Sequence, residues 1–179
     1  MVDRAIAFAT KAHEGQLRKG TMRPYIVHPV EVGDIVSTMT RDEEVISAAI
    51  LHDTIEDCDG ITKELLAELF SERVANFVAQ ESEDKSKSWI DRKMATINHL
   101  KVASMEVKMI GLADKLSNMR DINRDYPVCG EEFWNRFRMQ NKTMIGWYYK
   151  GIQFVLHDTF KGVAAYEEYC YLVEKNFDW

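Results

Sequence analysis

The segment AAILHDTIED, residues 48–57, places side chains that can bind a metal ion directly after an apolar run. His52 and Asp53 belong to it, and His28 and Asp114 are two more residues of ligand type near the ends of predicted helices. Two imidazoles and two carboxylates suit a borderline divalent ion such as Mn²⁺, Fe²⁺ or Zn²⁺. Calcium prefers oxygen ligands and magnesium keeps more water. Neighbouring residues of a helix point about 100° apart, so His52 and Asp53 can share one ion only if it lies in the angle between their side chains. Residues from other helices must then complete its shell.

Glu56 and Asp57 follow the predicted ligands by one helical turn, with Glu56 four residues after His52. Beside a metal ion, two such carboxylates can orient or deprotonate an attacking water and assist a leaving oxygen. Spacing alone leaves an alternative open, in which Asp53 and Glu56 face solvent at a helix end, because a single His-Asp dipeptide carries little information.

The elements that must position these residues are helices, because the chain shows helical periodicity throughout and has only three prolines. We predict helices at residues 2–13, 29–39, 42–54, 62–69, 71–80, 89–102, 104–121, about 130–157 and 160–176. Asp42 and Thr62 are predicted N-caps. The segments 15–24 and 81–88 are predicted loops, and RDYPVCG is a predicted break. A chain of 179 residues then fits one compact all-α domain.

A second His-Asp-Thr triplet lies at residues 157–159, where one predicted helix ends and the next begins. No acidic pair follows it, so the sequence predicts no metal ligand here. Asp158 or Thr159 is instead predicted to cap the following helix.

Composition restricts the partners and the compartment. A net charge of −6 disfavours binding to nucleic acid or to an anionic membrane. The three cysteines, Cys58, Cys129 and Cys170, form no CxxC pair, which favours a reducing compartment. With neither a signal-peptide pattern nor an apolar run long enough to span a bilayer, we expect a cytoplasmic protein. The sequence gives no prediction of oligomeric state.

Three segments resemble the signature motifs of the hydrolase domain of RelA/SpoT-type alarmone enzymes, a branch of the HD phosphohydrolase superfamily. They are AHEGQLRKGTMRPYIVHPVEV, AAILHDTIED and KMIGLADKLSNMRDI, in that order within about residues 1–125. The resemblance implies a helical HD fold over residues 1–179, completed by C-terminal helices at 130–176. It also implies one divalent ion, usually Mn²⁺. The activity implied is hydrolysis of the 3′-diphosphate of guanosine tetra- or pentaphosphate to GDP or GTP and pyrophosphate.

The resemblance also assigns roles by position. The metal ligands would be His28, His52, Asp53 and Asp114. Glu56 and Asp57 would position and activate water, and the sequence does not divide these two roles between them.

A basic loop precedes His28 and supplies Arg18, Lys19 and Arg23 within six residues. Exposed basic loops are often merely solvated, but the adjacent metal ligand favours phosphate binding, and arginine can also stack on a purine. In the resembling family the Arg-Lys pair of this loop contacts the nucleotide. His13, in the same segment, is predicted to pack or hydrogen-bond near the loop, with direct contact to the substrate as the alternative.

Further substrate contacts are predicted after Asp114. Asn118 shares a helical face with that ligand at i+4 and could hydrogen-bond ribose or base. Lys115 is also predicted to contact the substrate, although at i+1 it points in another direction than Asp114. Four more basic residues could line the far side of a cleft, and the sequence does not choose among them: Lys93, Arg136, Arg138 and Lys142.

Some positions depart from the long alarmone enzymes. Ser117 stands where those enzymes commonly carry histidine, and Cys58 stands where threonine is frequent. The segments SWIDRK and GWYYKG look more like small stand-alone members such as the metazoan SpoT homologues. The long alarmone enzymes continue into a synthetase domain, whereas this chain has 179 residues, so we expect hydrolysis without synthesis. The alternatives are an HD phosphohydrolase for another nucleotide and, ranked lower, a non-enzymatic nucleotide sensor.

Overall fold

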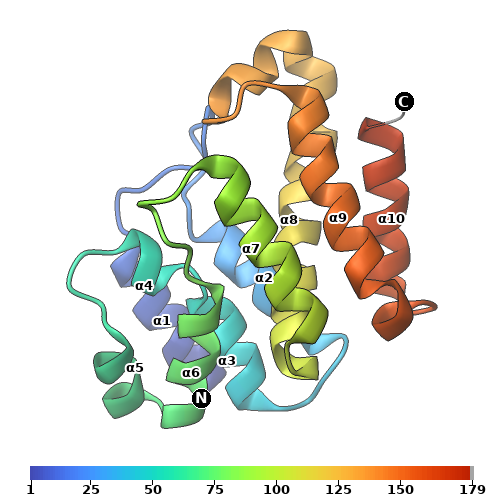
Figure 1. Ribbon diagram of the computed structural model, residues 1–179. Coiled ribbons are helices and arrows are strands. Elements are labelled where there is room, and N and C mark those ends of the chain that lie inside the picture. The colour runs from blue at the N-terminus through green and yellow to red at the C-terminus, as the bar shows by residue number, and fades with distance from the viewer. Residues whose placement is uncertain (178–179) are drawn as a thin grey trace. The chain divides into compact units, whose positions relative to one another are not determined.

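The periodic segments of the sequence form helices, as Figure 1 shows for a computed structural model that describes residues 1–177. The elements are α1 (Val2–Ala12), α2 (Val27–Ser37), α3 (Glu43–Leu51), α4 (Thr54–Asp57), α5 (Lys63–Leu69), α6 (Glu72–Glu81), α7 (Trp89–Val102), α8 (Met105–Cys129), the 3₁₀ helix η1 (Gly130–Arg136), α9 (Lys142–Phe160) and α10 (Ala164–Asn176). Within these residues the only extended pairing is an isolated bridge between Leu17 and Pro24. The all-α prediction is confirmed.

The described chain forms two compact units, and α8 contributes to both. The first unit comprises residues 1–83 and 104–114. In it α3 packs against α1, α2 and α6, and the short α4 also contacts α6. The two helices that approach the predicted ligands, α2 and α3, pack directly on each other and bury apolar residues such as Val32, Val36 and Leu51.

The second unit comprises residues 84–103 and the chain from 115 onward. Here α9 packs against both α7 and α10. Tyr169 is fully buried and donates a 2.8 Å hydrogen bond from its hydroxyl to the carbonyl oxygen of Tyr149. Arg120 joins α8 to α10 through a two-pronged ion pair with Glu168. The expectation of one domain over residues 1–179 stays a prediction.

Two predicted N-caps are confirmed. The side chain of Asp42 accepts a hydrogen bond from the N–H of Glu44, and that of Thr62 accepts one from the N–H of Leu65. Each bond satisfies a backbone donor that the first turn of a helix leaves without an intrahelical partner.

The helix predicted at 42–54 is interrupted at the residues of greatest interest. α3 ends at Leu51, and His52 and Asp53 form a turn before α4 begins. Side chains bind the carbonyls there: Thr54 Oγ1 donates to the carbonyl of Leu51 over 2.7 Å, and His52 Nδ1 contacts that of Ala49 at 2.8 Å. Such local bonds compete with the helical ladder and permit the break.

The predicted break after residue 121 is wrong, because α8 continues through Pro127. A proline removes one N–H donor, and near the end of a helix this costs a single hydrogen bond. An ion pair of 2.8 Å between Arg124 and Asp121 supports the same turns. The chain leaves the helix at Gly130, whose φ of +61° is a conformation that favours glycine.

The predicted cap at Asp158 or Thr159 is also wrong, because residues 157–159 lie inside α9. The break falls later, at Gly162, whose φ is +85°. Its N–H donates a 2.8 Å hydrogen bond to Glu167 Oε1 in the first turn of α10. A positive-φ glycine, rather than the polar triplet, separates the two helices.

Candidate metal centre

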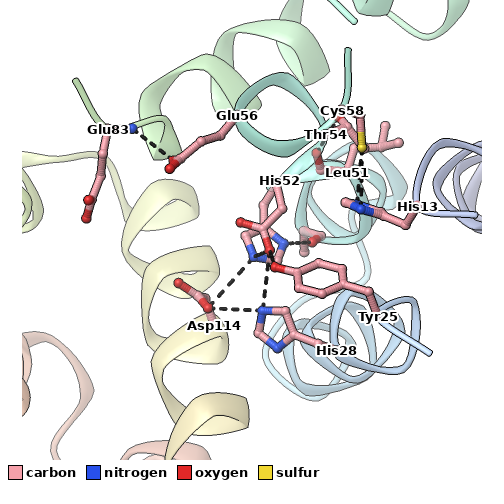
Figure 2. Close-up of polar contacts among 12 residues, drawn as sticks. His13, Tyr25, His28, Leu51, His52, Thr54, Glu56, Cys58, Glu83 and Asp114 are labelled. Atoms are coloured by element: carbon pink, nitrogen blue, oxygen red, sulfur yellow. Dashed lines mark hydrogen bonds and ion pairs between the residues drawn. The ribbon is translucent and has the colours of Figure 1, made fainter. Parts of the chain in front are cut away.

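Three buried side chains from three different elements meet in the first unit, as Figure 2 shows. They are His28 in the first turn of α2, His52 in the turn after α3, and Asp114 in α8. Each offers one ligand atom within 4.8 Å of the others. His28 Nε2 lies 3.2 Å from Asp114 Oδ1, and His52 Nε2 lies 3.8 Å from the same oxygen.

Asp53 adds a second carboxylate to this group. Its Oδ2 lies 3.0 Å from His52 Nε2 and 3.6 Å from His28 Nε2. The structure thus brings together all four residues that the sequence predicted as ligands. Atoms that bind one ion at ~2.1 Å are themselves roughly 3.0–3.4 Å apart in octahedral or tetrahedral geometry. The separations of 3.0 and 3.2 Å fall in that range, and those of 3.6 and 3.8 Å are slightly longer.

The tautomer of His52 gives a test of whether an ion fits. Because the carbonyl of Ala49 can only accept, the 2.8 Å contact requires His52 Nδ1 to carry a proton and donate it. His52 Nε2 is buried and forms no hydrogen bond among the described residues, yet carboxylate oxygens surround it. Among these carboxylates His52 Nε2 requires a positive charge, which a proton supplies in the metal-free protein and a bound cation can supply in its place. A divalent ion fits this donor set.

Burial and the neighbouring charges also determine the pKa values of the metal-free cluster. Burial alone would lower the pKa of His52, but the charges of Asp53 and Asp114 outweigh it and hold that pKa well above the ordinary histidine value. Burial would raise the pKa of Asp53, but the charge of His52 outweighs it and holds that pKa below the ordinary value. Burial lowers the pKa of His28, which favours the neutral imidazole that binds metals.

Tyr25 joins the cluster, although the sequence analysis missed it. Its hydroxyl donates a 2.5 Å hydrogen bond to Asp53 Oδ2. Its ring lies 4.8 Å from that of His13 and 5.9 Å from that of His28, and Arg18 Cζ lies 5.4 Å from its centroid. Burial, with the charge of Asp53 as the next cause, raises the pKa of the Tyr25 hydroxyl, so the group stays a donor. Its place three residues before His28 was the available sequence signal.

Glu56 and Asp57, the predicted catalytic pair, lie in α4, one turn beyond the ligands. Glu56 Oε2 accepts a 3.1 Å hydrogen bond from the backbone N–H of Glu83. The carbonyl of Asp57 accepts a 2.9 Å bond from Gln16 Nε2. Main-chain groups and an amide therefore fix this turn, and neither Glu83 nor Gln16 was predicted.

His13 holds the loop as the sequence predicted. Its Nδ1 lies 2.8 Å from Gln16 Oε1 and 3.4 Å from Cys58 Sγ. Burial and then the charge of Asp57 raise the pKa of the Cys58 thiol to about 11, so this cysteine stays protonated at neutral pH.

The basic loop folds back on itself beside the cluster. The N–H of Arg18 donates a 2.9 Å hydrogen bond to the carbonyl of Arg23, which holds the turn that contains Lys19. Arg18 lies over the ring of Tyr25, while Lys19 is exposed. At least Arg18 is thus placed near a predicted metal ligand.

The remaining predicted cations lie in the second unit. Lys115 and Lys93 both lie over the ring of Tyr148, at 5.9 Å and 4.9 Å from its centroid. Arg136 pairs with Asp125. Lys142 Nζ lies 4.7 Å from the ring centroid of Tyr126, and Asn118 follows Asp114 by one turn of α8.

Across the described part of the chain, no helix combines the length and apolar character needed to cross a membrane.

Comparisons with known proteins agree with this geometry. The model of the HD domain family matches residues 5–133, which includes every predicted ligand, and the chain belongs to that family.

The relatives of this chain point to a narrower group within the HD domain family. The chain is 41% identical over 140 residues to guanosine-3′,5′-bis(diphosphate) 3′-pyrophosphohydrolase MESH1 of Danio rerio, covering 75% of this chain and 74% of the relative. It is 37% identical over 141 residues to the Homo sapiens protein of the same name, covering 76% and 75%. A solved metazoan ortholog of SpoT, described as hydrolysing ppGpp, matches with a TM-score of 0.79 and 28% identity over 97% of this chain and 93% of that one. The predicted resemblance to alarmone hydrolases is confirmed.

Proposed function

We propose that this protein is a metal-dependent phosphohydrolase that removes the 3′-diphosphate of guanosine 3′,5′-bis(diphosphate) or its pentaphosphate, giving GDP or GTP and pyrophosphate. The observation that carries the proposal is the convergence of His28, His52, Asp53 and Asp114, whose facing nitrogen and oxygen atoms lie 3.0–3.8 Å apart. We infer the guanosine substrate from the activity for which the relatives are named.

The four converging residues would hold one divalent ion, which we propose to be Mn²⁺. Such an ion, when bound, supplies Lewis-acid polarisation of a phosphate oxygen. In the reaction a water oxygen bonds to the phosphorus that carries the ribose 3′ oxygen, and the bond between that phosphorus and the 3′ oxygen breaks. The 3′ oxygen takes up a proton as pyrophosphate leaves.

The chain's own groups would handle the protons and the charge. Glu56 or Asp57 would accept the proton of the attacking water, and the hydrogen bond from Glu83 supports Glu56 by fixing its carboxylate. Arg18, with Lys19 and Arg23 on the same loop, would offset the charge of the diphosphate. The substrate contacts of Lys115 and Asn118, and the cytoplasm as compartment, stay predictions from the sequence.

Pyrophosphate release tests the proposal. Purified protein stripped with a chelator is given guanosine 3′,5′-bis(diphosphate) with and without Mn²⁺, beside a panel of other nucleotides at matched concentration. We expect Mn²⁺-dependent release that His52→Ala abolishes. His157→Ala is the matched control, because this exposed histidine also precedes an Asp-Thr pair and should leave turnover unchanged.

The other outcomes separate the alternatives. Mn²⁺-dependent release of phosphate from a different nucleotide alone would replace the guanosine assignment and keep the metal site. Nucleotide binding without turnover of any member of the panel would indicate a sensor.

A further inference from the structure

The hydroxyl of Tyr25 contacts the carboxylate oxygen of Asp53 that also faces the two histidines. The O–O distance is 2.5 Å, and the same Oδ2 lies 3.0 Å from His52 Nε2 and 3.6 Å from His28 Nε2. The Asp53 side chain is 21% exposed, against 2–3% for the two histidines. Of these three groups, Asp53 has the least packing around it, so its orientation depends most on hydrogen bonds.

The position of Tyr25 is itself fixed from several sides. Its N–H donates a 2.9 Å hydrogen bond to the carbonyl of Gln16, and its own carbonyl accepts a 3.0 Å bond from the N–H of His28. Its ring packs against that of His13 and beneath the guanidinium of Arg18. The hydroxyl is therefore a donor whose place is set by the loop and the start of α2, not by Asp53 alone.

We propose that Tyr25 is a positioning residue, which holds Asp53 in its metal-binding orientation and links that ligand to the basic loop through Arg18. The inference rests on the proposed function in that Asp53 is taken as a ligand. A carboxylate oxygen can accept one hydrogen bond and still bind a metal through its other lone pair. Partners that orient a ligand in this way typically change metal affinity 10–100-fold when removed.

The test compares two tyrosine-to-phenylalanine variants by calorimetric titration of chelator-stripped protein with Mn²⁺ alone. Tyr25→Phe should bind Mn²⁺ about 10–100-fold more weakly than the parent protein. Tyr169→Phe is the matched control, since it also removes a hydroxyl that donates to a buried oxygen, but in the second unit. Its affinity should be unchanged. Thermal melting of the metal-free proteins shows that each variant is folded.

A kinetic comparison separates positioning from simple packing. At saturating Mn²⁺, Tyr25→Phe should recover the parent kcat and KM, because it keeps the ring under Arg18 and only weakens retention of the ion. Tyr25→Leu removes the ring as well, so its KM should stay raised at saturating Mn²⁺. If Tyr25→Phe binds Mn²⁺ as tightly as the parent does, the proposal is overturned.

These results are distinguishable from failure of the proposed function. Loss of Mn²⁺ affinity in Tyr25→Phe, in a protein that releases no pyrophosphate from the guanosine substrate, supports the role of Tyr25 and rejects the substrate. If the parent protein shows metal-dependent turnover of the guanosine substrate and Tyr25→Phe keeps the parent Mn²⁺ affinity, the proposed function is supported and the role of Tyr25 is rejected. A parent protein that binds no Mn²⁺ overturns both.

Discussion

The backbone N–H of Glu83 donates a 3.1 Å hydrogen bond to Oε2 of Glu56, so the carboxylate proposed to activate water is oriented by the main chain (Figure 2). Glu83 lies just beyond α6, and α4, which carries Glu56, packs on that helix. The interaction needs only the amide of residue 83 and not its side chain.

Proline and alanine at position 83 therefore have different expected effects. Glu83→Pro removes the donor, and Ser82, at φ −74° and ψ 133°, already has the backbone conformation required before a proline. Because a hydrogen bond to a charged group contributes about 1.5–3 kcal/mol, kcat should fall ~10-fold or more in Glu83→Pro. Glu83→Ala should retain the parent kcat. Steady-state assays at saturating Mn²⁺ measure this, and equal kcat values in the two variants would contradict it.

Exchange of the acidic pair separates the roles of its members. Glu56→Ala should bind Mn²⁺ like the parent protein and lose about 10²–10⁴-fold in kcat, which is the usual contribution of a general base. Asp57→Ala provides the comparison, and the larger loss of kcat identifies the residue that takes the proton. Calorimetric Mn²⁺ titration confirms that the site is intact. A fully active Glu56→Ala enzyme would reject the assignment.

The four predicted metal ligands could be proposed from the sequence because their residue types are those that bind metal ions. Two imidazoles and two carboxylates are of metal-ligand type, but their spacing alone left solvent exposure of Asp53 open, and the resemblance to the alarmone hydrolases assigned the four as ligands. The groups that orient them were not predictable, because the partners lie far apart in sequence. Tyr25 and Asp53 are 28 residues apart, and Glu56 and Glu83 are 27 apart. A main-chain donor such as the N–H of Glu83 also leaves no signature in residue type.

Helix positions were predicted better than helix ends. Apolar periodicity located the core-facing segments, because burial of one face dictates that pattern. The break after Leu51 depends on side chains of His52 and Thr54 that bind carbonyls in space, and periodicity does not report such bonds. The continuation of α8 through Pro127 reflects the small cost of one lost bond near a helix end.

The ion pairs of Arg73 predict a pH-dependent stability. Arg73 Nη1 lies 2.7 Å from Asp42 Oδ2 and 2.8 Å from Glu44 Oε2. The hydrogen bond from Arg73 lowers the pKa of Asp42, and the hydrogen bonds from Ser71 and then Arg73 lower that of Glu44. A carboxyl whose pKa is lower in the folded state stabilises the protein above its unfolded pKa of about 4, and that contribution is lost as the pH falls.

Arg73→Ala should therefore lower the free energy of unfolding by no more than ~1 kcal/mol at pH 7, because the groups are partly exposed. The difference from the parent protein should shrink as the pH falls below ~4 and the carboxyls gain protons. Urea unfolding at pH 7, 5, 4 and 3 measures it. Exposed Lys101→Ala is the control for removal of one charge, and a deficit of Arg73→Ala that stays constant down to pH 3 would contradict the prediction.

The close approach of α2 and α3 at Gly33 should set both stability and metal affinity. A Cβ at Gly33 would lie 2.5 Å from Cγ1 of Ile50, so the buried Ile50 side chain or one of the two helices has to shift. Gly33 follows His28 by five residues and Ile50 precedes His52 by two, so separating the helices moves the two imidazoles apart. Alanine favours an exposed helix by about 1 kcal/mol over glycine, but overpacking a core costs about 1–3 kcal/mol.

Gly33→Ala should accordingly be destabilised by roughly 1–2 kcal/mol in urea unfolding and bind Mn²⁺ more weakly. Ile50→Ala alone should cost ~2–5 kcal/mol through the cavity it leaves. The double variant removes the atoms that the new Cβ would meet, so its destabilisation should be smaller than the sum of the two single effects. Additive effects, or a Gly33→Ala protein more stable than the parent, would show that contact with Ile50 does not fix the spacing of these helices.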